Sequence, residues 1–286
     1  MLEGLKRISA GTLPGCVILL FLLVFFSALG IPRLRFLSGQ SRLSADTVQS
    51  SGFRRQTVPT EAAERIRKMD APGSYLAVYW LETRFGETGG DLTEEEAAAC
   101  RKRWERTEGW GGYLGACQAV WDDLECFPVA SKGSGIRVSF EDSWMFDRTY
   151  REERGHEGTD IMPDANRRGV LPVVSMTDGV VEKLGWLELG GYRVGIRAPG
   201  GAYFYYAHLD SYGDIREGSE VKAGDLLGFM GDTGYGTEEG TKGKFPVHLH
   251  VGIYIGSGEE EVSVNPYAAL RYLEEKKTGV SVILKT

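Results

Sequence analysis

The second half of the chain consists of short runs of β-branched and aromatic residues separated by Gly, Asp and Asn. Gly191–Arg197 (GYRVGIR) and Ala202–His208 (AYFYYAH) are two such runs. Runs of this length, bounded by turn-forming residues, are typical of β-strands. The pattern begins after Phe127-Pro128, so we predict a mainly β domain over residues 128–275, followed by a short C-terminal tail over residues 276–286.

Residues 59–127 carry helix-start signals instead. Helices are expected to begin near Pro59, with Ser74 as N-cap, with a capping box at Thr93–Glu96, and near Gly112. Four tryptophans in this region are more typical of a packing core than of a ligand platform: Trp80, Trp104, Trp110 and Trp121. The sequence therefore predicts a small α-helical domain before the β domain, and its role cannot be read from these residues.

The N-terminus carries an apolar run, since residues 8–32 contain no charged side chain. A run of this length is sufficient to cross a bilayer of roughly 30 Å as one helix. A cleaved signal peptide is the alternative, because Lys6 and Arg7 precede the run and Ala28–Gly30 resembles a small-residue cleavage site. We expect a retained membrane anchor over residues 1–32, because the uncharged run exceeds the ~7–15 residues of a signal core.

Residues 33–58 are rich in Ser, Arg, Gln and Gly and show no sustained apolar period, which predicts a linker. The net charge is −7 and the chain lacks a basic stripe, which argues against nucleic acid as a partner.

Outside the apolar run the cysteines are Cys100, Cys117 and Cys126. Their spacing does not resemble zinc knuckles, and one disulfide with unassigned partners remains an open expectation.

All four histidines of the chain lie in the β-rich half, at positions 156, 208, 248 and 250. A single strand histidine is usually a satisfied surface or core residue, but four in one half indicate a common site. Period-2 alternation places His248 and His250 on one face of their strand, with Leu249 and Val251 on the core face. The same rule would place His208 on one face with Phe204 and Tyr206.

A zinc ion accepts imidazole nitrogen and carboxylate oxygen, and a catalytic zinc site keeps one position for water. His156, Asp160 and His250 would supply three such ligands. Gly155 and Gly158 permit the tight backbone path that can turn the first two toward one point.

Three motifs resemble the lysostaphin/LytM-type zinc metalloendopeptidases of peptidoglycan: Gly155–Asp160 (GHEGTD), Tyr206–Leu209 (YAHL) and His248–His250 (HLH). The segments that connect them are similar too: Asp178–Val181, Val221–Gly228 and Gly231–Gly234. The resemblance covers roughly residues 128 to 270 and rests on the ordered set of motifs, since each motif alone is weakly specific.

The resemblance implies an antiparallel sheet forming the floor of an open groove, with a peptidoglycan peptide as substrate. It implies that His156, Asp160 and His250 bind Zn²⁺, that His248 is the general base, and that His208 is a second catalytic histidine near the developing oxyanion. Because peptidoglycan lies outside the membrane, it also implies a single-pass membrane protein with an extracytoplasmic catalytic domain, or a secreted one if the N-terminus is cleaved.

The chain departs from the family pattern beside the last motif. Phe245–Val247 precedes it in place of a Gly-Pro, after an apparent insertion at residues 238–244, and Val251-Gly252 follows it in place of Phe-Glu. The main rival function is a catalytically silent scaffold or partner-binding module of a cell-envelope complex, and a zinc hydrolase of another exported peptide is a third. Retention of all five polar positions favours the active enzyme, while protein partners cannot be read from the sequence.

Overall fold

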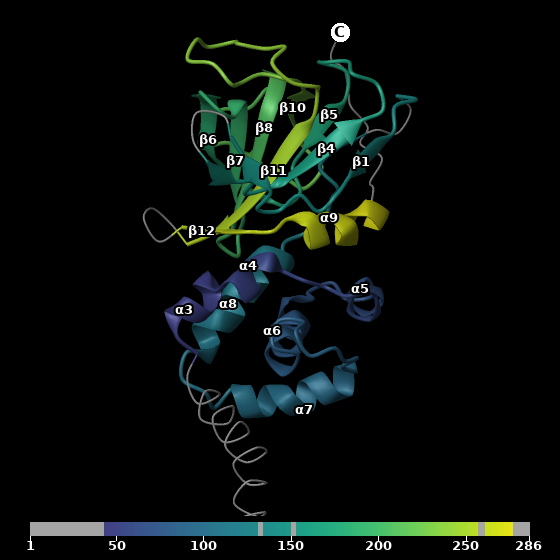
Figure 1. Ribbon diagram of the computed structural model, residues 1–286, viewed down its shortest axis with the longest axis vertical. Coiled ribbons are helices and arrows are strands. Elements are labelled where there is room, and N and C mark those ends of the chain that lie inside the picture. The colour runs from purple at the N-terminus through teal and green to yellow at the C-terminus, as the bar shows by residue number, and fades with distance from the viewer. Residues whose placement is uncertain (1–42, 131–133, 150–152, 257–260, 277–286) are drawn as a thin grey trace, which may run out of the picture.

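The computed structural model describes residues 43–130, 134–149, 153–256 and 261–276, and it shows a group of helices on one side of a β-rich layer (Figure 1). Its α-helices are α3 (Ala45–Gln49), α4 (Ser51–Arg55), α5 (Thr60–Ile66), α6 (Gly73–Glu82), α7 (Glu94–Trp104), α8 (Trp110–Trp121) and α9 (Tyr267–Leu273). A 3₁₀ turn, η3 (Glu274–Lys276), follows α9.

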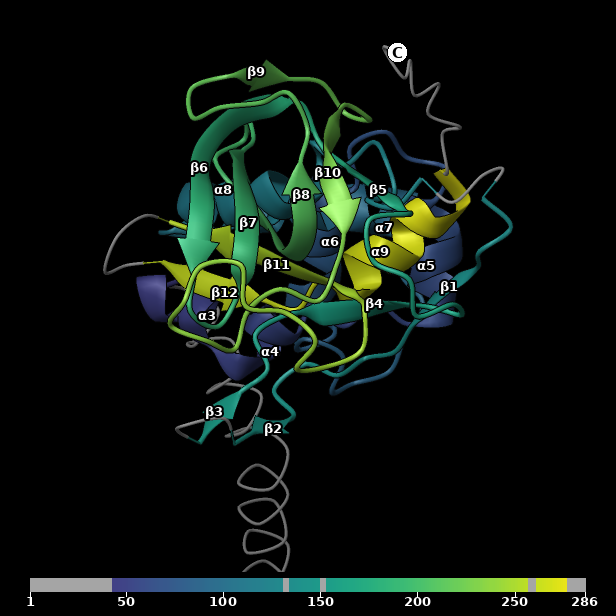
Figure 2. The same ribbon diagram turned by 90° about the horizontal axis from the view of Figure 1, so that it is seen from above.

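The strands form one large antiparallel sheet and one short ribbon. They are β1 (Val138–Phe140), β2 (Asp147–Arg148), β3 (Arg154–Gly155), β4 (Thr159–Pro163), β5 (Pro172–Val174), β6 (Gly179–Leu187), β7 (Gly191–Arg197), β8 (Tyr203–Tyr212), β9 (Glu220–Val221), β10 (Leu226–Met230), β11 (Leu249–Ile255) and β12 (Val262–Val264). The main order is β1-β4-β11-β8-β7-β6-β9, with β10 beside β8 and β5, and β12 beside β11. The β2–β3 ribbon lies beside this sheet (Figure 2). The predicted antiparallel β domain is confirmed.

The helical region follows the sequence signals except at one helix start. The capping box is present, with Thr93 and Glu96 bonded reciprocally at the start of α7. The four tryptophans are buried, as expected for a packing core. Helix α6, however, begins one residue before Ser74, and Ser74 does not cap it. The backbone N–H of Gly73 donates to Asp122 Oδ1 at 2.6 Å, so a side chain beyond the end of α8 satisfies the helix start.

Residues 43–58 form α3 and α4 instead of continuing the linker that the sequence predicts over 33–58. The cause is Phe53, which is fully buried and makes edge contacts with Trp80 and Tyr113 at centroid distances of 6.1 and 5.7 Å. One aromatic residue in a polar stretch produces no periodic pattern, so this anchor depends on partners far along the chain.

We expect Phe53→Ala to lower the free energy of unfolding by about 3–5 kcal/mol, the usual cost of emptying a buried phenylalanine site. Ser51→Ala is the matched control, because Ser51 is exposed in the same helix and should change stability by less than about 0.5 kcal/mol. Chemical denaturation of both variants measures the difference. Equal stability of the two would show that α4 does not belong to the core.

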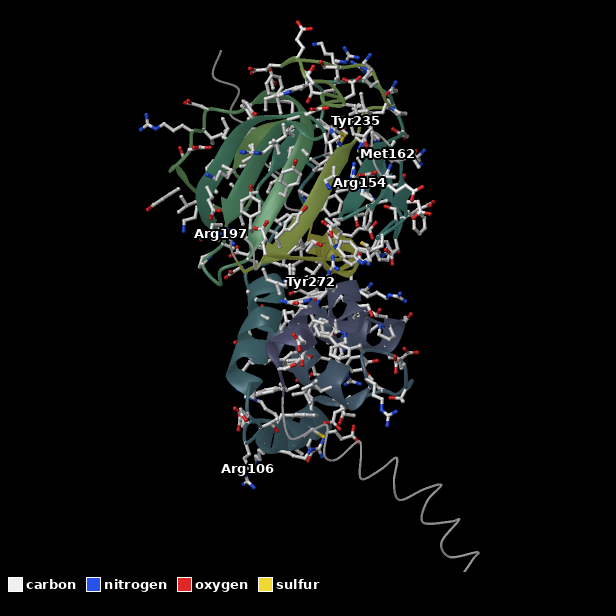
Figure 3. All side chains as sticks on the ribbon, turned by 60° about the vertical axis from the view of Figure 1, so that its left-hand side comes forward. Arg106, Arg154, Met162, Arg197, Tyr235 and Tyr272 are labelled. Carbon is white, nitrogen blue, oxygen red and sulfur yellow. The ribbon has the colours of Figure 1, made fainter. Side chains whose placement is uncertain are left out.

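The helices and the sheet share one hydrophobic core. Trp121 of α8 makes an edge contact with Tyr272 of α9 at 6.0 Å, and the Tyr272 hydroxyl donates to the Met69 carbonyl at 2.9 Å. Figure 1 shows α9 between the helical layer and the sheet, and Figure 3 labels Tyr272 at this junction. The helical region is therefore packed onto the β domain rather than tethered to it.

The predicted membrane segment and the C-terminal residues 277–286 lie outside the described residues. Within the described residues, every helix is too short or too polar to span a bilayer. No disulfide joins the three cysteines that the structure describes, Cys100, Cys117 and Cys126.

Candidate metal centre

Three predicted ligands meet at one point. His156 Nε2 lies 3.1 Å from Asp160 Oδ1 and 3.0 Å from His250 Nδ1, and the last two atoms are 3.0 Å apart. Tetrahedral zinc ligands at ~2.0–2.1 Å from the ion are roughly 3.3 Å from one another. Two imidazole nitrogens and one carboxylate oxygen at this spacing fit the donor set of zinc.

Sheet pairing and a short ribbon bring the ligands together. Asp160 in β4 lies directly opposite His250 in β11. His156 follows β3, and its Nδ1 lies 3.0 Å from Ser143 Oγ and 3.2 Å from the Ser143 carbonyl oxygen. A carbonyl can only accept, so Nδ1 carries the proton and Nε2 presents its lone pair to the site.

Arg148 orients the carboxylate of Asp160 through the oxygen that does not face the histidines. Arg148 donates to Asp160 Oδ2 at 2.7 Å, which leaves Oδ1 directed at the two histidines. Burial alone would raise the pKa of Asp160, but the adjacent His156 and His250 side chains outweigh this effect and hold that pKa well below its usual range. Sequence reasoning missed Arg148 and Ser143, because neither stands in a motif and both reach the site by tertiary contact.

His248 and His208 lie beside the triad as a pair, with ring centroids 4.7 Å apart. Each ring donates Nδ1–H to a backbone carbonyl: His248 to Pro246 at 2.7 Å, and His208 to Thr233 at 2.8 Å. Nε2 of each ring is therefore the unprotonated nitrogen, and that of His248 lies 3.8 Å from Asp160 Oδ1. Burial lowers the pKa of both histidines, which keeps them neutral near pH 7.

The two histidines reach the groove by different routes. His248 follows the predicted alternation, since Leu249 and Val251 are fully buried on the other face. The prediction that His208 shares a face with Phe204 and Tyr206 is wrong. Those two side chains are in the core, whereas His208 lines the groove.

The reason is a bulge in β8. His208 has a φ of +64°, and the register with β7 shifts there, so the alternation breaks. A non-glycine residue in this conformation costs about 1–3 kcal/mol and is common at functional sites.

An open groove of about 1020 Å³ contains the triad and both further histidines. Tyrosines from β8 and β11 form part of its floor, and arginines and glutamates stand along it. Its other lining side chains include Arg148, Arg154, Glu157, Leu187, Arg193, Tyr203, Tyr205, Tyr235, Tyr254 and Glu261. Figure 3 labels Arg154 and Tyr235, both in the sheet half of the molecule, away from the helices. The predicted groove over the sheet is confirmed.

Gly158 is required by close packing against a ligand. A Cβ atom at this position would lie 2.3 Å from Cε1 of His250 and 2.7 Å from the Val251 carbonyl oxygen. Gly158→Ala should therefore displace the His250 ring and weaken zinc affinity by at least ~10-fold, the scale of disturbed ligand orientation. Gly115→Ala, at an exposed helix position with open space, should leave affinity unchanged. Competition with a zinc chelator measures both, and equal affinities would refute the packing argument.

Comparison with known proteins adds two family matches. Residues 154–266 match the sequence model of peptidase family M23, and residues 38–123 match that of the LytM N-terminal domain. A crystal structure from Ruminococcus gnavus, provisionally assigned as a glycyl-glycine endopeptidase LytM, has 48% identity and a TM-score of 0.75, covering 80% of this chain and 93% of that chain.

Curated relatives are similar over somewhat less than half of this chain. An L-Ala–D-Glu endopeptidase of Bacillus subtilis (strain 168) is 43% identical over 137 residues, which is 48% of this chain and 40% of that protein. Lysostaphin of Staphylococcus simulans is 29% identical over 129 residues, which is 44% of this chain and 24% of that protein. The chain thus spans less than half the length of these curated relatives.

Proposed function

The chain belongs to peptidase family M23, with a LytM-type N-terminal domain, and we propose that it is a zinc endopeptidase that hydrolyses peptide bonds in peptidoglycan. One observation carries this proposal: the ligand triangle of His156, Asp160 and His250 lies in a groove beside two buried neutral imidazoles. That combination supplies a metal site and proton acceptors within one open cleft.

In the proposed mechanism, His156, Asp160 and His250 hold the ion through Nε2, Oδ1 and Nδ1. Zinc, when bound, supplies the Lewis acidity that lowers the pKa of water and polarises a scissile carbonyl. His248 accepts a proton at Nε2 and can later deliver it to the leaving amine, because its Nδ1–H stays bonded to the Pro246 carbonyl. His208, tied to Thr233 in the same way, steadies developing charge once it is protonated.

A digest of purified peptidoglycan tests this proposal. The protein should release peptide fragments with new amino termini, identified by mass spectrometry, only when zinc-loaded. A soluble fragment should begin at residue 43, because α3 and α4 belong to the core. Zinc-loaded, folded protein that releases no fragment would contradict the proposal.

The rival function, a catalytically silent scaffold, requires the site to be incomplete. All three ligands and both imidazoles are present with the orientations that hydrolysis needs, which supports activity. The same digest separates the two functions, because a scaffold would bind peptidoglycan or protein and cut nothing.

We also propose that the uncharged residues 8–32 anchor the chain, with Lys6 and Arg7 cytoplasmic and the remainder outside. Protease added to intact spheroplasts should then remove the catalytic domain, as followed with an antibody against it. Signal cleavage would instead release the domain into the medium. Protection until lysis would reverse the orientation and exclude peptidoglycan as substrate.

A further inference from the structure

Arg193 stands across the groove floor from the proposed metal site. In β7 it lies between Tyr192, paired with Leu209, and Val194, paired with Tyr206, so it faces the bulge of β8 at residues 207–208. Ala207 in turn lies opposite His250 of β11. The row from Arg193 through Ala207 to His250 spans two strand spacings, or roughly 10 Å.

Arg193 has small neighbours and, among the described residues, no ion-pair partner. Its neighbours in the adjacent strands are small, Gly185 on one side and Ala207 on the other. Its Nη1 is buried without a hydrogen-bond partner, and Arg193 forms no ion pair within the part of the chain that the structure describes. Burial raises the pKa of Tyr203 and Tyr205 on the groove floor, and the nearby charge of Arg193 opposes that rise.

Two other arginines of the region are committed to partners, whereas Arg154 also lines the groove and has a buried Nε without a hydrogen-bond partner. Arg148 bonds Asp160, and Arg197, four residues along β7 on the same face, forms a two-pronged ion pair with Glu182 at 2.6 and 2.9 Å. An unpaired buried guanidinium donor is costly, and carboxylates are the ligands that satisfy its two-pronged geometry best. Arg193 thus lines the groove with a donor group suited to a carboxylate and with no ion-pair partner among the described residues.

We propose that Arg193 binds a substrate carboxylate next to the scissile bond, so that the preferred substrate is an anionic peptide of the L-Ala–γ-D-Glu class rather than a glycine bridge. This inference rests on the proposed endopeptidase function. A γ-linked D-glutamyl residue keeps a free α-carboxylate on the carbon bonded to the scissile nitrogen. A glycyl-glycine bond has no charged group in that position, so it offers nothing for the guanidinium to bind.

Three synthetic peptides test the specificity on the zinc-loaded protein: acyl-L-Ala-γ-D-Glu-L-Lys, its D-isoglutamine analogue with a carboxamide in place of the α-carboxylate, and pentaglycine. The wild type should cleave the acidic peptide fastest. Arg193→Met should reduce kcat/KM for it by about 10- to 100-fold, the range for a lost charge-assisted hydrogen bond. The same variant should change the rate for the carboxamide analogue by less than about 3-fold, and Arg193→Lys should be intermediate.

Arg197→Met is the matched control, because Arg197 is on the same strand and does not line the groove. It should retain the preference for the acidic peptide, and zinc content and melting temperature are measured on every variant. Equal cleavage of acidic and carboxamide peptides by the wild type, faster cleavage of pentaglycine, or an equal loss on both stem peptides in Arg193→Met would overturn the inference alone. No cleavage of any peptide or of whole peptidoglycan by the zinc-loaded wild type would overturn the proposed function with it.

Discussion

Replacing His250 with alanine should abolish tight zinc binding and, with it, peptidoglycan cleavage. His250 Nδ1 forms one corner of a triangle whose sides are all 3.0–3.1 Å, so its loss leaves two donors that hold the ion poorly. The zinc affinity should fall by more than the ~10- to 100-fold that is typical when a residue hydrogen-bonded to a ligand is changed. His156→Ala and Asp160→Ala should behave alike, because each supplies one of the other corners.

Metal analysis after dialysis, with chelator competition for affinity, measures this loss. Tyr254→Phe is the control, since Tyr254 lies four residues along β11 on the same face and contributes no ligand atom to the triangle. It should keep about one zinc per chain. Full zinc occupancy in His250→Ala would remove this residue from the metal site.

His248→Ala should retain zinc and the fold but lose about 10²–10⁴-fold in turnover, the usual contribution of general acid–base catalysis. His208→Ala should lose a comparable factor, because its Nε2 belongs to the same pair of buried imidazoles. If the two rings act together in the same step, the loss in the double variant should be smaller than the product of the two single losses.

Zinc content, melting temperature and turnover must be measured on the same proteins. His208 has edge contacts with Phe245 and Tyr235 at 4.6 and 6.1 Å, so its removal also affects packing. A lower melting temperature with normal turnover per folded molecule would assign that ring a packing role. Near wild-type turnover in zinc-loaded His248→Ala would refute its role as the base.

The sequence alone predicted the features that depend on residues close together in the chain. Alternation along β11 and the residue before it separates His248 and His250 from the buried Leu249 and Val251, because side chains of extended chain alternate by geometry. The capping box of α7 joins residues three apart, Thr93 and Glu96, so it could be read directly. The ordered histidine motifs likewise predicted which side chains form the proposed metal centre.

Tertiary structure decided the features whose partners are remote in sequence. His208 reaches the groove only because pairing with both neighbouring strands stabilises a left-handed backbone that alternation does not predict. Phe53 and Asp122 act through contacts with residues at least 27 and 49 positions away, respectively. Arg197 differs from Arg193 in its ion pair with Glu182 of β6 and in its hydrogen bonds to the carbonyls of Gly201 and Gly256. Such pairings depend on sheet register and helix packing, which a local sequence pattern does not predict.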